Sequence, residues 1–376
     1  MNKKDLKIAL AHDFLVEFGG AERVLKVLCE MFPDAPIYSL LYDKEKAPEW
    51  LKNKKIHTSF LQKFPKFLRQ RKKWLLPFFP VAPETFDLRD FDLVISSSGA
   101  WSKGIITRLN TIHIAYLHSP IRFAWDMNGE YLDQQKKCGI TNFFARAVLN
   151  YIRVWDKAAA DRPEYIISNS KYTQARIKKY YGRESEVIYP PVEILSSGRD
   201  EAMPRLYSGD KYFLVISRLS PYKKVDVVIE AFNKLKLPLV IVGSGGQEKY
   251  LKSIAGETIK FLGFQPDEKL PEIYANARAF IFPCVDDFGV APAEAMSFGV
   301  PVLAVRKGGA REIVLEGKTG EFFENATPEN IIGSVNKFIE KEKQYDKEFI
   351  KFRAGEFSKE RFKKELGEYI DNIINF

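Results

Sequence analysis

Three carboxylates stand between two apolar runs in the last third of the chain, in the stretch CVDDFGVAPAEAMSFG (Cys284–Gly299). The preceding residues RAFIFP and the following residues VPVLAV each predict a buried strand, and a fold does not need acids between them. Asp286 and Asp287 come at the end of the first strand, and Glu294 follows eight residues after Asp286. We therefore expect Asp286 and Glu294 to reach one ligand-binding cleft.

Glu294 lies in a predicted helix whose ends are marked by its flanking residues. Pro292 suits the first turn, Gly299 suits the first position after the helix, and Pro301 stops it. We therefore expect Glu294 in the first turn, near the positive end of the helix dipole. There its carboxylate could cap the helix, or it could accept two hydroxyl hydrogen bonds, as from a ribose diol.

Two cations follow another predicted strand, in VISRLSPYKKVDVVIEAF. Arg218 ends the strand, and Lys223 comes five residues later in a turn before a helix. Two cations at a strand exit can neutralise a diphosphate, although they could also be a solvated pair in a loop. The next predicted strand ends in VIVGSGG, where Gly243, Gly245 and Gly246 could form a phosphate-cradling turn. This spacing matches neither the P-loop nor the GxGxxG fingerprint.

The N-terminal half contains a weaker set of candidates. Gly19 and Gly20 directly precede a predicted helix whose exposed N–H groups favour an anion, although an ordinary tight turn with Glu22 in the first helical turn explains them as well. His12 and His118 lie near strand ends. A structural histidine is the more common role, but HSP after an apolar strand favours His118 as a site residue.

No metal site is expected. The sequence DFD (Asp90–Asp92) looks like a metal-binding DxD motif, but it precedes its apolar strand, which predicts a turn and not a Mg²⁺ site at a strand exit. Cys29, Cys138 and Cys284 are widely spaced and odd in number, which argues against a disulfide framework or zinc cluster and predicts a reducing cytoplasm. We expect neither metal nor cofactor.

The elements that must position these residues alternate between strand and helix along 376 residues, a length that suits two domains. The pattern predicts an α/β fold with two doubly wound, Rossmann-like domains that face each other across a cleft. We expect the domains at residues 1–192 and 193–356, joined by the Pro-, Ser- and Gly-rich segment YPPVEILSSGRDEAMPRLYSGD, with an amphipathic helix at 357–376.

The formal net charge of +9 favours anionic partners. Between Phe60 and Pro83 no acidic residue occurs, and basic residues alternate with aromatic ones, which suits a membrane interface. The expected membrane or acceptor surface consists of Lys63, Lys66, Arg69, Arg71, Lys72, Lys73 and Trp74. The same segment could equally be a solvated loop whose aromatics pack on their own domain. Nucleic acid is not expected as a partner, because no binding module accompanies the patch. No apolar run is long enough to span a membrane, and the N-terminus lacks a secretory signal.

Taken together, these motifs resemble the retaining glycosyltransferase family 4, which has the GT-B fold. The spacing from Asp286 to Glu294 with FG inside it and the stretch SRLSPYKK carry the resemblance. It extends over nearly the whole chain, because HDFLVEFGGAERVL, YLHSPIRFAWD, NSKYTQARIKKYYG and YPPV are similar to bacterial mannosyltransferases that build surface polysaccharides such as O-antigen. In the GT-B fold the C-terminal helix crosses back to the N-terminal domain.

The resemblance implies a role for each matching residue. Glu294 would bind the nucleotide ribose, Asp286 would contact donor-sugar hydroxyls, Arg218 and Lys223 would hold the donor diphosphate, and His118 would lie near the reacting end of the donor. The nucleotide site would include Gly243, Gly245 and Phe264, and the sugar and phosphate site Gly19, Gly20, Asp287, Phe288 and Gly289. His118, Asp286, Arg218 and Lys223 are the expected catalytic residues.

The resemblance also implies a substrate pair and a location. The donor would be GDP-mannose and the acceptor a lipid-linked saccharide, at the inner face of the cytoplasmic membrane. The family usually has Glu where this chain has Asp286, which is one methylene shorter, so a UDP- or ADP-sugar donor and a GT-B sugar-nucleotide epimerase stay open. A nicotinamide-dependent oxidoreductase is disfavoured, because neither half has the GxGxxG fingerprint. A silent GT-B binding subunit is disfavoured by the retained Arg218, Lys223 and Glu294.

Overall fold

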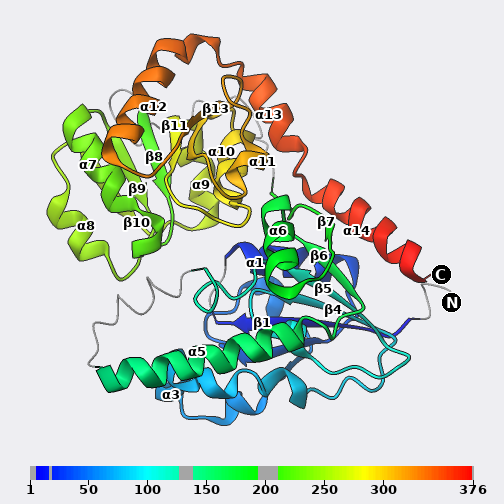
Figure 1. Ribbon diagram of the computed structural model, residues 1–376. Coiled ribbons are helices and arrows are strands. Elements are labelled where there is room, and N and C mark those ends of the chain that lie inside the picture. The colour runs from blue at the N-terminus through cyan, green and yellow to red at the C-terminus, as the bar shows by residue number, and fades with distance from the viewer. Residues whose placement is uncertain (1–5, 17–18, 127–138, 194–210, 375–376) are drawn as a thin grey trace. The chain divides into compact units, whose positions relative to one another are not determined.

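The computed structural model describes residues 6–16, 19–126, 139–193 and 211–374. The chain divides into two compact units (Figure 1). Unit 1 comprises Met1–Pro191 and Phe362–Phe376, and unit 2 comprises Val192–Arg361. The expected boundary at 192/193 lies beside this division, and most of the expected linker lies outside the described residues.

Unit 1 is an α/β unit. Its elements are β1 (Ile8–Leu15), α1 (Gly20–Met31), β2 (Ile37–Tyr42), α2 (Glu49–Lys52), β3 (Ile56–Thr58), η2 (Phe60–Lys63), α3 (Lys66–Gln70), η3 (Lys72–Phe78), η4 (Ala82–Thr85), β4 (Leu93–Ser98), η5 (Ser102–Gly104), β5 (Ile112–Leu117), α5 (Gly139–Ala159), β6 (Tyr165–Ser168), α6 (Lys171–Tyr181), β7 (Glu186–Val187) and most of α14 (Lys359–Ile374).

The seven strands of unit 1 are all parallel, in the order β3-β2-β1-β4-β5-β6-β7. Because successive side chains of a strand point to opposite faces, the apolar strands bury both faces of this sheet. One face packs with α1 and α14, whose Phe362, Leu366 and Ile370 are buried in its core. The other face packs with α5 and the segment 60–86.

Unit 2 repeats the architecture with fewer strands. Its elements are β8 (Tyr212–Ile216), η6 (Pro221–Lys223), α7 (Val225–Leu235), β9 (Leu239–Val242), α8 (Glu248–Ile254), β10 (Ile259–Gly263), η7 (Asp267–Lys269), α9 (Leu270–Ala275), β11 (Ala277–Phe282), α10 (Val290–Ser297), β12 (Val302–Val305), α11 (Ala310–Ile313), β13 (Gly320–Phe323), α12 (Pro328–Lys341), η8 (Glu342–Gln344) and α13 (Lys347–Gly355).

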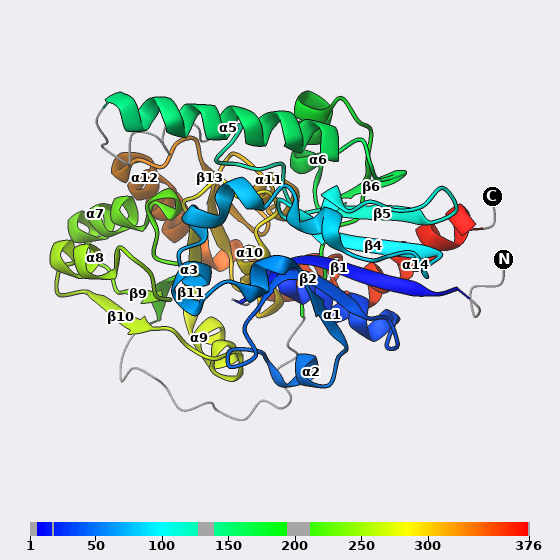
Figure 2. The same ribbon diagram turned by 90° about the horizontal axis from the view of Figure 1, so that it is seen from below.

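The six strands of unit 2 are also parallel, in the order β10-β9-β8-β11-β12-β13. Both views show α7, α8 and α12 grouped together beside this sheet (Figures 1 and 2). In each unit the order reverses beside the first strand, and open parallel sheets bind ligands at the carboxyl ends of strands around such a point. The two predicted Rossmann-like sheets are confirmed.

Candidate functional site

The carboxyl edge of the unit 2 sheet brings together a cation and an acid that are distant in sequence. Lys223 lies in η6 after β8, and Asp286 follows the neighbouring strand β11. Lys223 Nζ donates to Asp286 Oδ2 at 2.5 Å, and both side chains are largely buried, at 13% and 18% exposure. Burial alone would lower the pKa of Lys223, but the Asp286 carboxylate outweighs burial and raises it. Lys223 therefore stays a cation, with further N–H donors for a ligand.

Asp286 also accepts from the thiol of Cys284, with 3.6 Å between Sγ and Oδ2. The Lys223 ammonium lies 5.0 Å from the centre of the Tyr222 ring and 5.9 Å from that of Phe282. The pair is thus held from several sides, and the Asp286 carboxylate contacts both Lys223 and Cys284 through Oδ2.

The prediction that Glu294 lies in the first turn of its helix is wrong. Helix α10 begins at Val290, with no acidic residue in its first turn, because Gly289 adopts φ 90° and lets the helix start two residues before Pro292. Pro292 is then the third helical residue, where its missing N–H removes no intrahelical bond. The prediction for the C-terminal end of this helix is confirmed, since Gly299 follows the C-cap Phe298 with φ 72°.

Glu294 is buried within α10, at 8% exposure, and its Oε2 accepts from the Tyr274 hydroxyl at 3.0 Å. Tyr274 stacks in turn on Phe298, with 5.5 Å between ring centres. Asp287 and Phe288 are buried as well, at 7% and 3% exposure. The Glu294 carboxylate is therefore fixed by a tyrosine from α9, which the sequence did not reveal.

Two glycine-containing loops of unit 2 are packed backbone to backbone. A Cβ on Gly243, whose φ is 129°, would lie 1.9 Å from the Ser217 carbonyl oxygen, and one on Gly245 would lie 2.2 Å from that of Leu219. The Gly243 N–H already donates to the Gly263 carbonyl. These glycines thus bring the loops after β8 and β9 together, and their contact with a phosphate stays a prediction.

A second glycine pair, Gly308–Gly309, was missed by the sequence analysis. A Cβ on Gly308 would lie 2.4 Å from the Asp286 carbonyl oxygen, and one on Gly309 would lie 2.5 Å from that of Asp287. Gly309 also donates its N–H to the Asp286 carbonyl at 2.9 Å. The pair supports the backbone of the acidic loop, and the GG sequence after VPVLAV was the signal for it.

The remaining predicted nucleotide residues of unit 2 are exposed. Arg218 follows the carboxyl end of β8, and Phe264 follows that of β10 with 74% of its side chain exposed. An exposed ring at this edge can stack on a base. The structure thus places Arg218, Lys223, Phe264, Asp286 and the glycines at the same edge of one sheet.

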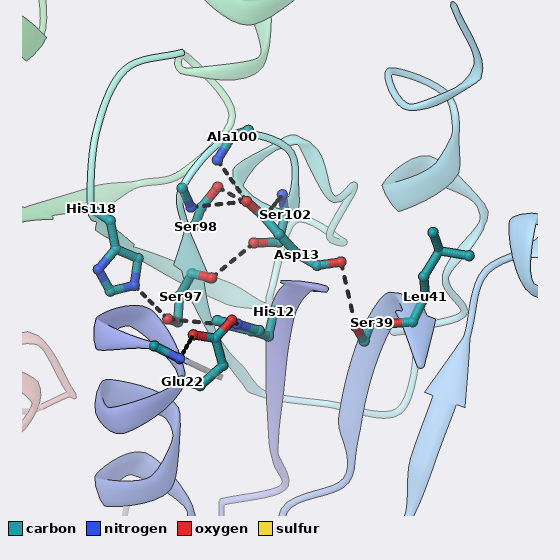
Figure 3. Close-up of polar contacts among 12 residues, drawn as sticks. His12, Asp13, Glu22, Ser39, Leu41, Ser97, Ser98, Ala100, Ser102 and His118 are labelled. Atoms are coloured by element: carbon teal, nitrogen blue, oxygen red, sulfur yellow. Dashed lines mark hydrogen bonds and ion pairs between the residues drawn. The ribbon is translucent and has the colours of Figure 1, made fainter. Parts of the chain in front are cut away.

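The corresponding edge of unit 1 is organised around a buried acid that the sequence analysis did not select. Asp13, near the end of β1, is 7% exposed. Its carboxylate accepts the backbone N–H groups of Gly99, Ala100, Trp101 and Ser102 at 2.6 to 3.0 Å (Figure 3). Four N–H groups on one carboxylate fix the loop that follows β4.

Next to this loop, a chain of side chains links His118 to the start of α1 (Figure 3). His118 Nε2 lies 2.8 Å from Ser97 Oγ, which lies 3.2 Å from His12 Nδ1, and His12 Nε2 lies 3.5 Å from Glu22 Oε1. Glu22 Oε2 accepts the Gly19 N–H at 2.8 Å. His12 and Ser97 are adjacent in the β1–β4 register, which sequence alone does not provide.

The same glutamate defines the role of the glycine pair. Gly19 is the N-cap of α1 and Glu22 its third residue, so the bond from the Gly19 N–H to the Glu22 carboxylate is one half of a capping box, and Gly20 begins the helix. Burial by itself would raise the pKa of Glu22, but its hydrogen bond and attraction to His12 lower it. The turn thus has the structural role that the sequence allowed, and both glycines are exposed, as a ligand would require.

The basic-aromatic segment of unit 1 is divided between core and surface. Leu61, Leu75 and Phe79 are buried, whereas Phe67 and Trp74 are 63% and 65% exposed. Lys63, Lys66, Arg71 and Lys73 are exposed, Arg69 is half-buried, and the side chain of Lys72 lies outside the described residues.

The motif at 90–92 lies at the amino end of β4, where Asp92 accepts the Lys7 N–H, so its prediction as a turn is confirmed. Within the described ranges no group of His, Cys, Asp and Glu side chains is arranged to hold a metal ion. Cys29 and Cys284 are free and buried, and Cys138 lies outside the described residues. None of the helices in the described part of the chain is long and apolar enough to cross a membrane.

Comparison with known proteins gives two family matches. The model for glycosyl transferases group 1 matches residues 198–352, and the model for glycosyltransferase family 4 matches residues 18–194. The GDP-mannose-dependent alpha-(1-6)-phosphatidylinositol monomannoside mannosyltransferase of Mycolicibacterium smegmatis is 31% identical over 45% of this chain and 51% of its own length. The human alpha-1,3/1,6-mannosyltransferase ALG2 is 26% identical over 61% of this chain and 62% of its own length. The chain spans about half the length of the first of these relatives.

Among solved structures, Anabaena HepE in complex with UDP-glucose superposes with a TM-score of 0.70 at 20% identity, over 97% of this chain and 99% of that one. This likeness concerns the fold. Two parallel Rossmann-like sheets, one family match on each unit and the resemblance of the motifs agree. The chain belongs to glycosyltransferase family 4 and has the GT-B fold.

Proposed function

We propose that this protein is a retaining mannosyltransferase that transfers mannose from GDP-mannose to a lipid-linked saccharide during synthesis of a surface polysaccharide. Unit 2 binds the donor and unit 1 the acceptor. Two of the relatives described above are mannosyltransferases, one of them GDP-mannose-dependent, and they support this substrate class.

The observation that carries the proposal is the carboxyl edge of the unit 2 sheet. Lys223 is held there as a cation against Asp286, Arg218 is exposed beside β8, and the Glu294 carboxylate is fixed in α10. Two cations suit a diphosphate, a fixed carboxylate suits a ribose diol, and an aspartate suits sugar hydroxyls. Phe264 offers its exposed ring to the base.

The chemistry follows from these charges. The bond between the anomeric carbon and the phosphate oxygen breaks, and its electron pair leaves with the nucleoside diphosphate, which gains one negative charge. An acceptor hydroxyl forms the new bond to the anomeric carbon and releases its proton. Arg218 and Lys223 stabilise the leaving diphosphate, and charge stabilisation of this kind is commonly the largest catalytic contribution. No metal ion is needed in this scheme, because the two cations supply the positive charge.

A UDP-sugar donor is the second candidate, since the similar HepE structure holds UDP-glucose. Thermal unfolding with GDP, UDP, ADP and their sugar conjugates in parallel separates the candidates, because a ligand at 100 times its Kd adds about 2.7 kcal/mol to the native state. A shift selective for GDP and GDP-mannose supports the proposal. A shift with UDP or ADP species overturns the mannosyl assignment, and no shift with any nucleotide favours a silent subunit.

Donor turnover tests the catalytic assignment. We expect Lys223→Met and Arg218→Ala each to lower kcat/KM for donor hydrolysis or transfer by about 100-fold, the typical loss for one charge-stabilising group. Lys224→Met is the matched control, because Lys224 is exposed and adjacent to Lys223. Equal activity of the Lys223 and Lys224 variants would contradict the role of Lys223 in catalysis.

We also propose that unit 1 docks on an anionic membrane, peripherally and at its inner face. Phe67 and Trp74 are exposed among basic side chains, with the Arg71 guanidinium 5.9 Å from the centre of the Trp74 ring. Helix α5 packs in the same apolar cluster as this segment and exposes Phe143 and Val154, at 70% and 64%. Basic groups and exposed rings on one surface suit headgroups and the acyl boundary.

Vesicle sedimentation tests this docking. Replacing Lys66 and Lys73 by Glu should weaken binding to vesicles containing phosphatidylglycerol by at least about tenfold, since each basic side chain near an anionic surface contributes about 1 kcal/mol. Lys52→Glu, at an exposed lysine of α2, is the control. Unchanged sedimentation of the double variant would refute the membrane assignment.

A further inference from the structure

The chain His118–Ser97–His12–Glu22 in unit 1 joins a predicted catalytic residue to two residues for which the sequence indicated only structural roles (Figure 3). We propose that His12 is a positioning residue that acts through Ser97 and sets His118 as a neutral hydrogen-bond acceptor for a hydroxyl group of the substrate. This inference rests on the proposed function for the identity of the substrate.

The argument starts at Glu22, whose carboxylate can only accept hydrogen bonds when it is ionised. Its pKa is lowered because His12 outweighs the effect of burial, so it is ionised at neutral pH. The facing nitrogen, His12 Nε2 at 3.5 Å, therefore carries the hydrogen. When the imidazole of His12 is neutral, its other nitrogen is an acceptor, and His12 Nδ1 then accepts from Ser97.

The direction of the hydrogen bonds at Ser97 determines which nitrogen of His118 carries its hydrogen. Its hydroxyl has one hydrogen, which is donated to His12 Nδ1 at 3.2 Å. Ser97 Oγ must then accept from His118 Nε2 at 2.8 Å, so this nitrogen carries the hydrogen of His118. Burial, with a further contribution from His12, lowers the pKa of His118 to about 4, so the ring is neutral. His118 Nδ1 is left with a lone pair.

The lone pair decides which substrate group can face His118. In the part of the chain that the structure describes, no partner of His118 Nδ1 is found, and the nitrogen points away from Ser97 (Figure 3). A sugar hydroxyl can donate to it, whereas a phosphate oxygen only accepts and would be repelled. His118 therefore contacts a hydroxyl group and not the diphosphate.

Protonation of His12 would reverse the chain. With hydrogens on both His12 nitrogens, Ser97 Oγ accepts from Nδ1 and donates to His118 Nε2, so the hydrogen of His118 moves to Nδ1. The charged or titratable groups around His12 are Glu22 on α1, Asp13 on β1 and His118 after β5.

Strands β4 and β5 contain a second serine–histidine pair, which is not hydrogen-bonded to His12. Ser96 Oγ lies 2.8 Å from His113 Nε2, and both residues are fully buried. Because successive residues of a strand point to opposite faces, Ser96 lies on the other face of the sheet from Ser97. Ser96→Ala thus removes a similar buried hydrogen bond and serves as the control for Ser97→Ala.

The first experiment determines the tautomer of His118 directly and does not require the enzyme to turn over a substrate. Long-range ¹⁵N–¹H correlation spectra of the ¹⁵N-histidine-labelled protein at pH 8, with its four histidines assigned by single His→Gln variants, should show His118 with hydrogen on Nε2 only. Ser97→Ala should give a mixture of tautomers at His118, and Ser96→Ala should leave the His118 signals unchanged. Hydrogen on Nδ1 in the wild type, or no effect of Ser97→Ala, would overturn the proposal.

The second experiment measures turnover and nucleotide binding. We expect Ser97→Ala to lower kcat about tenfold, the value of one hydrogen bond, while GDP-induced stabilisation is kept. Ser97→Thr retains the hydroxyl and should restore kcat. Equal losses in Ser96→Ala and Ser97→Ala would indicate a purely structural role. If the wild type neither binds nucleotides nor turns over a donor, the proposed function fails, and the tautomer measurement still decides the role of His12.

Discussion

The two units share a parallel sheet, but they hold the loops at its carboxyl edge by different means. In unit 2 the loops approach backbone to backbone, at Gly243 and Gly245 and again at Gly308 and Gly309. In unit 1 the loop after β4 is held by the buried carboxylate of Asp13, and the tightly packed glycine that follows it, Gly104, faces the side chain of Trp155 and not another backbone.

The difference separates two ways of building a site. Backbone contact at glycines leaves no room for any side chain, and its bonds do not depend on ionisation. A buried carboxylate or imidazole tolerates more space but depends on its charge and on every partner being present. The two units should therefore respond differently to a single methyl group, to loss of a charge and to acid.

The largest effect is expected from Gly243→Ala in unit 2. Its Cβ would lie 1.9 Å from the Ser217 carbonyl oxygen at a φ of 129°, so the two loops must separate. We expect a loss of more than about 4 kcal/mol in the free energy of unfolding, measured by urea titration with circular dichroism. Gly246→Ala in the same loop is the control, because a Cβ there meets nothing within 4 Å. Similar losses in both variants would show that the close approach is not the cause.

The next effect tests the carboxylate of unit 1. Asp13→Asn replaces one accepting oxygen by an NH₂ group that faces backbone N–H donors, and it removes the charge that they stabilise. We expect a loss of about 3 kcal/mol, in the range of buried charged hydrogen bonds. Tryptophan fluorescence during urea unfolding reports it, because Trp101 lies in the loop. Asp43→Asn keeps an oxygen that can accept the one local bond from the Glu45 N–H, so it should change little. Equal free energies of unfolding for the Asp13→Asn and Asp43→Asn variants would show that Asp13 does not hold the loop after β4.

The fold was largely predictable because its signals are local. Apolar runs such as LVIV at β9 and the amphipathic helix after Gly19 and Gly20 can be recognised within a few residues. The start of α10 was not, because Pro292 predicted a first turn whereas Gly289 permitted an earlier one. A left-handed residue before a helix has no unambiguous sequence signal.

The candidate sites were predictable to different extents for a related reason. Lys223 and Asp286 follow motifs with recognisable spacing, so the acid and the cation of unit 2 were selected from sequence. Asp13 and Ser97 were not, because their partners are about 85 residues away and meet only through the β1–β4 register. The polar residues HD and SSS in otherwise apolar strands were the available signal.

The smallest effect is expected from a decrease in pH, which should lower the stability of unit 1, because this unit contains all four histidines. Burial, with a further contribution from Arg162, lowers the pKa of His113 to about 3, and the unfolded chain has the ordinary value of 6.5. Below pH 6.5 the unfolded state binds a proton that the native state does not, so stability falls as the pH decreases towards the folded pKa. His118, with a pKa of about 4, acts in the same direction.

Between pH 7 and pH 6 we expect the stability of unit 1 to decrease by about 0.7 kcal/mol for each of these two histidines, because each site in the unfolded chain binds on average about half a proton in this range. The lowered pKa of Glu22 affects stability only near and below the ordinary glutamate pKa of 4.5, so this window isolates the imidazoles. Urea unfolding followed by tryptophan fluorescence measures unit 1, because all five tryptophans lie there. The double variant Ser96→Ala/His113→Leu removes both partners of one buried bond and should reduce the pH dependence by about half, because His118 remains. An unchanged slope in that variant would show that His113 does not contribute to the acid sensitivity of unit 1.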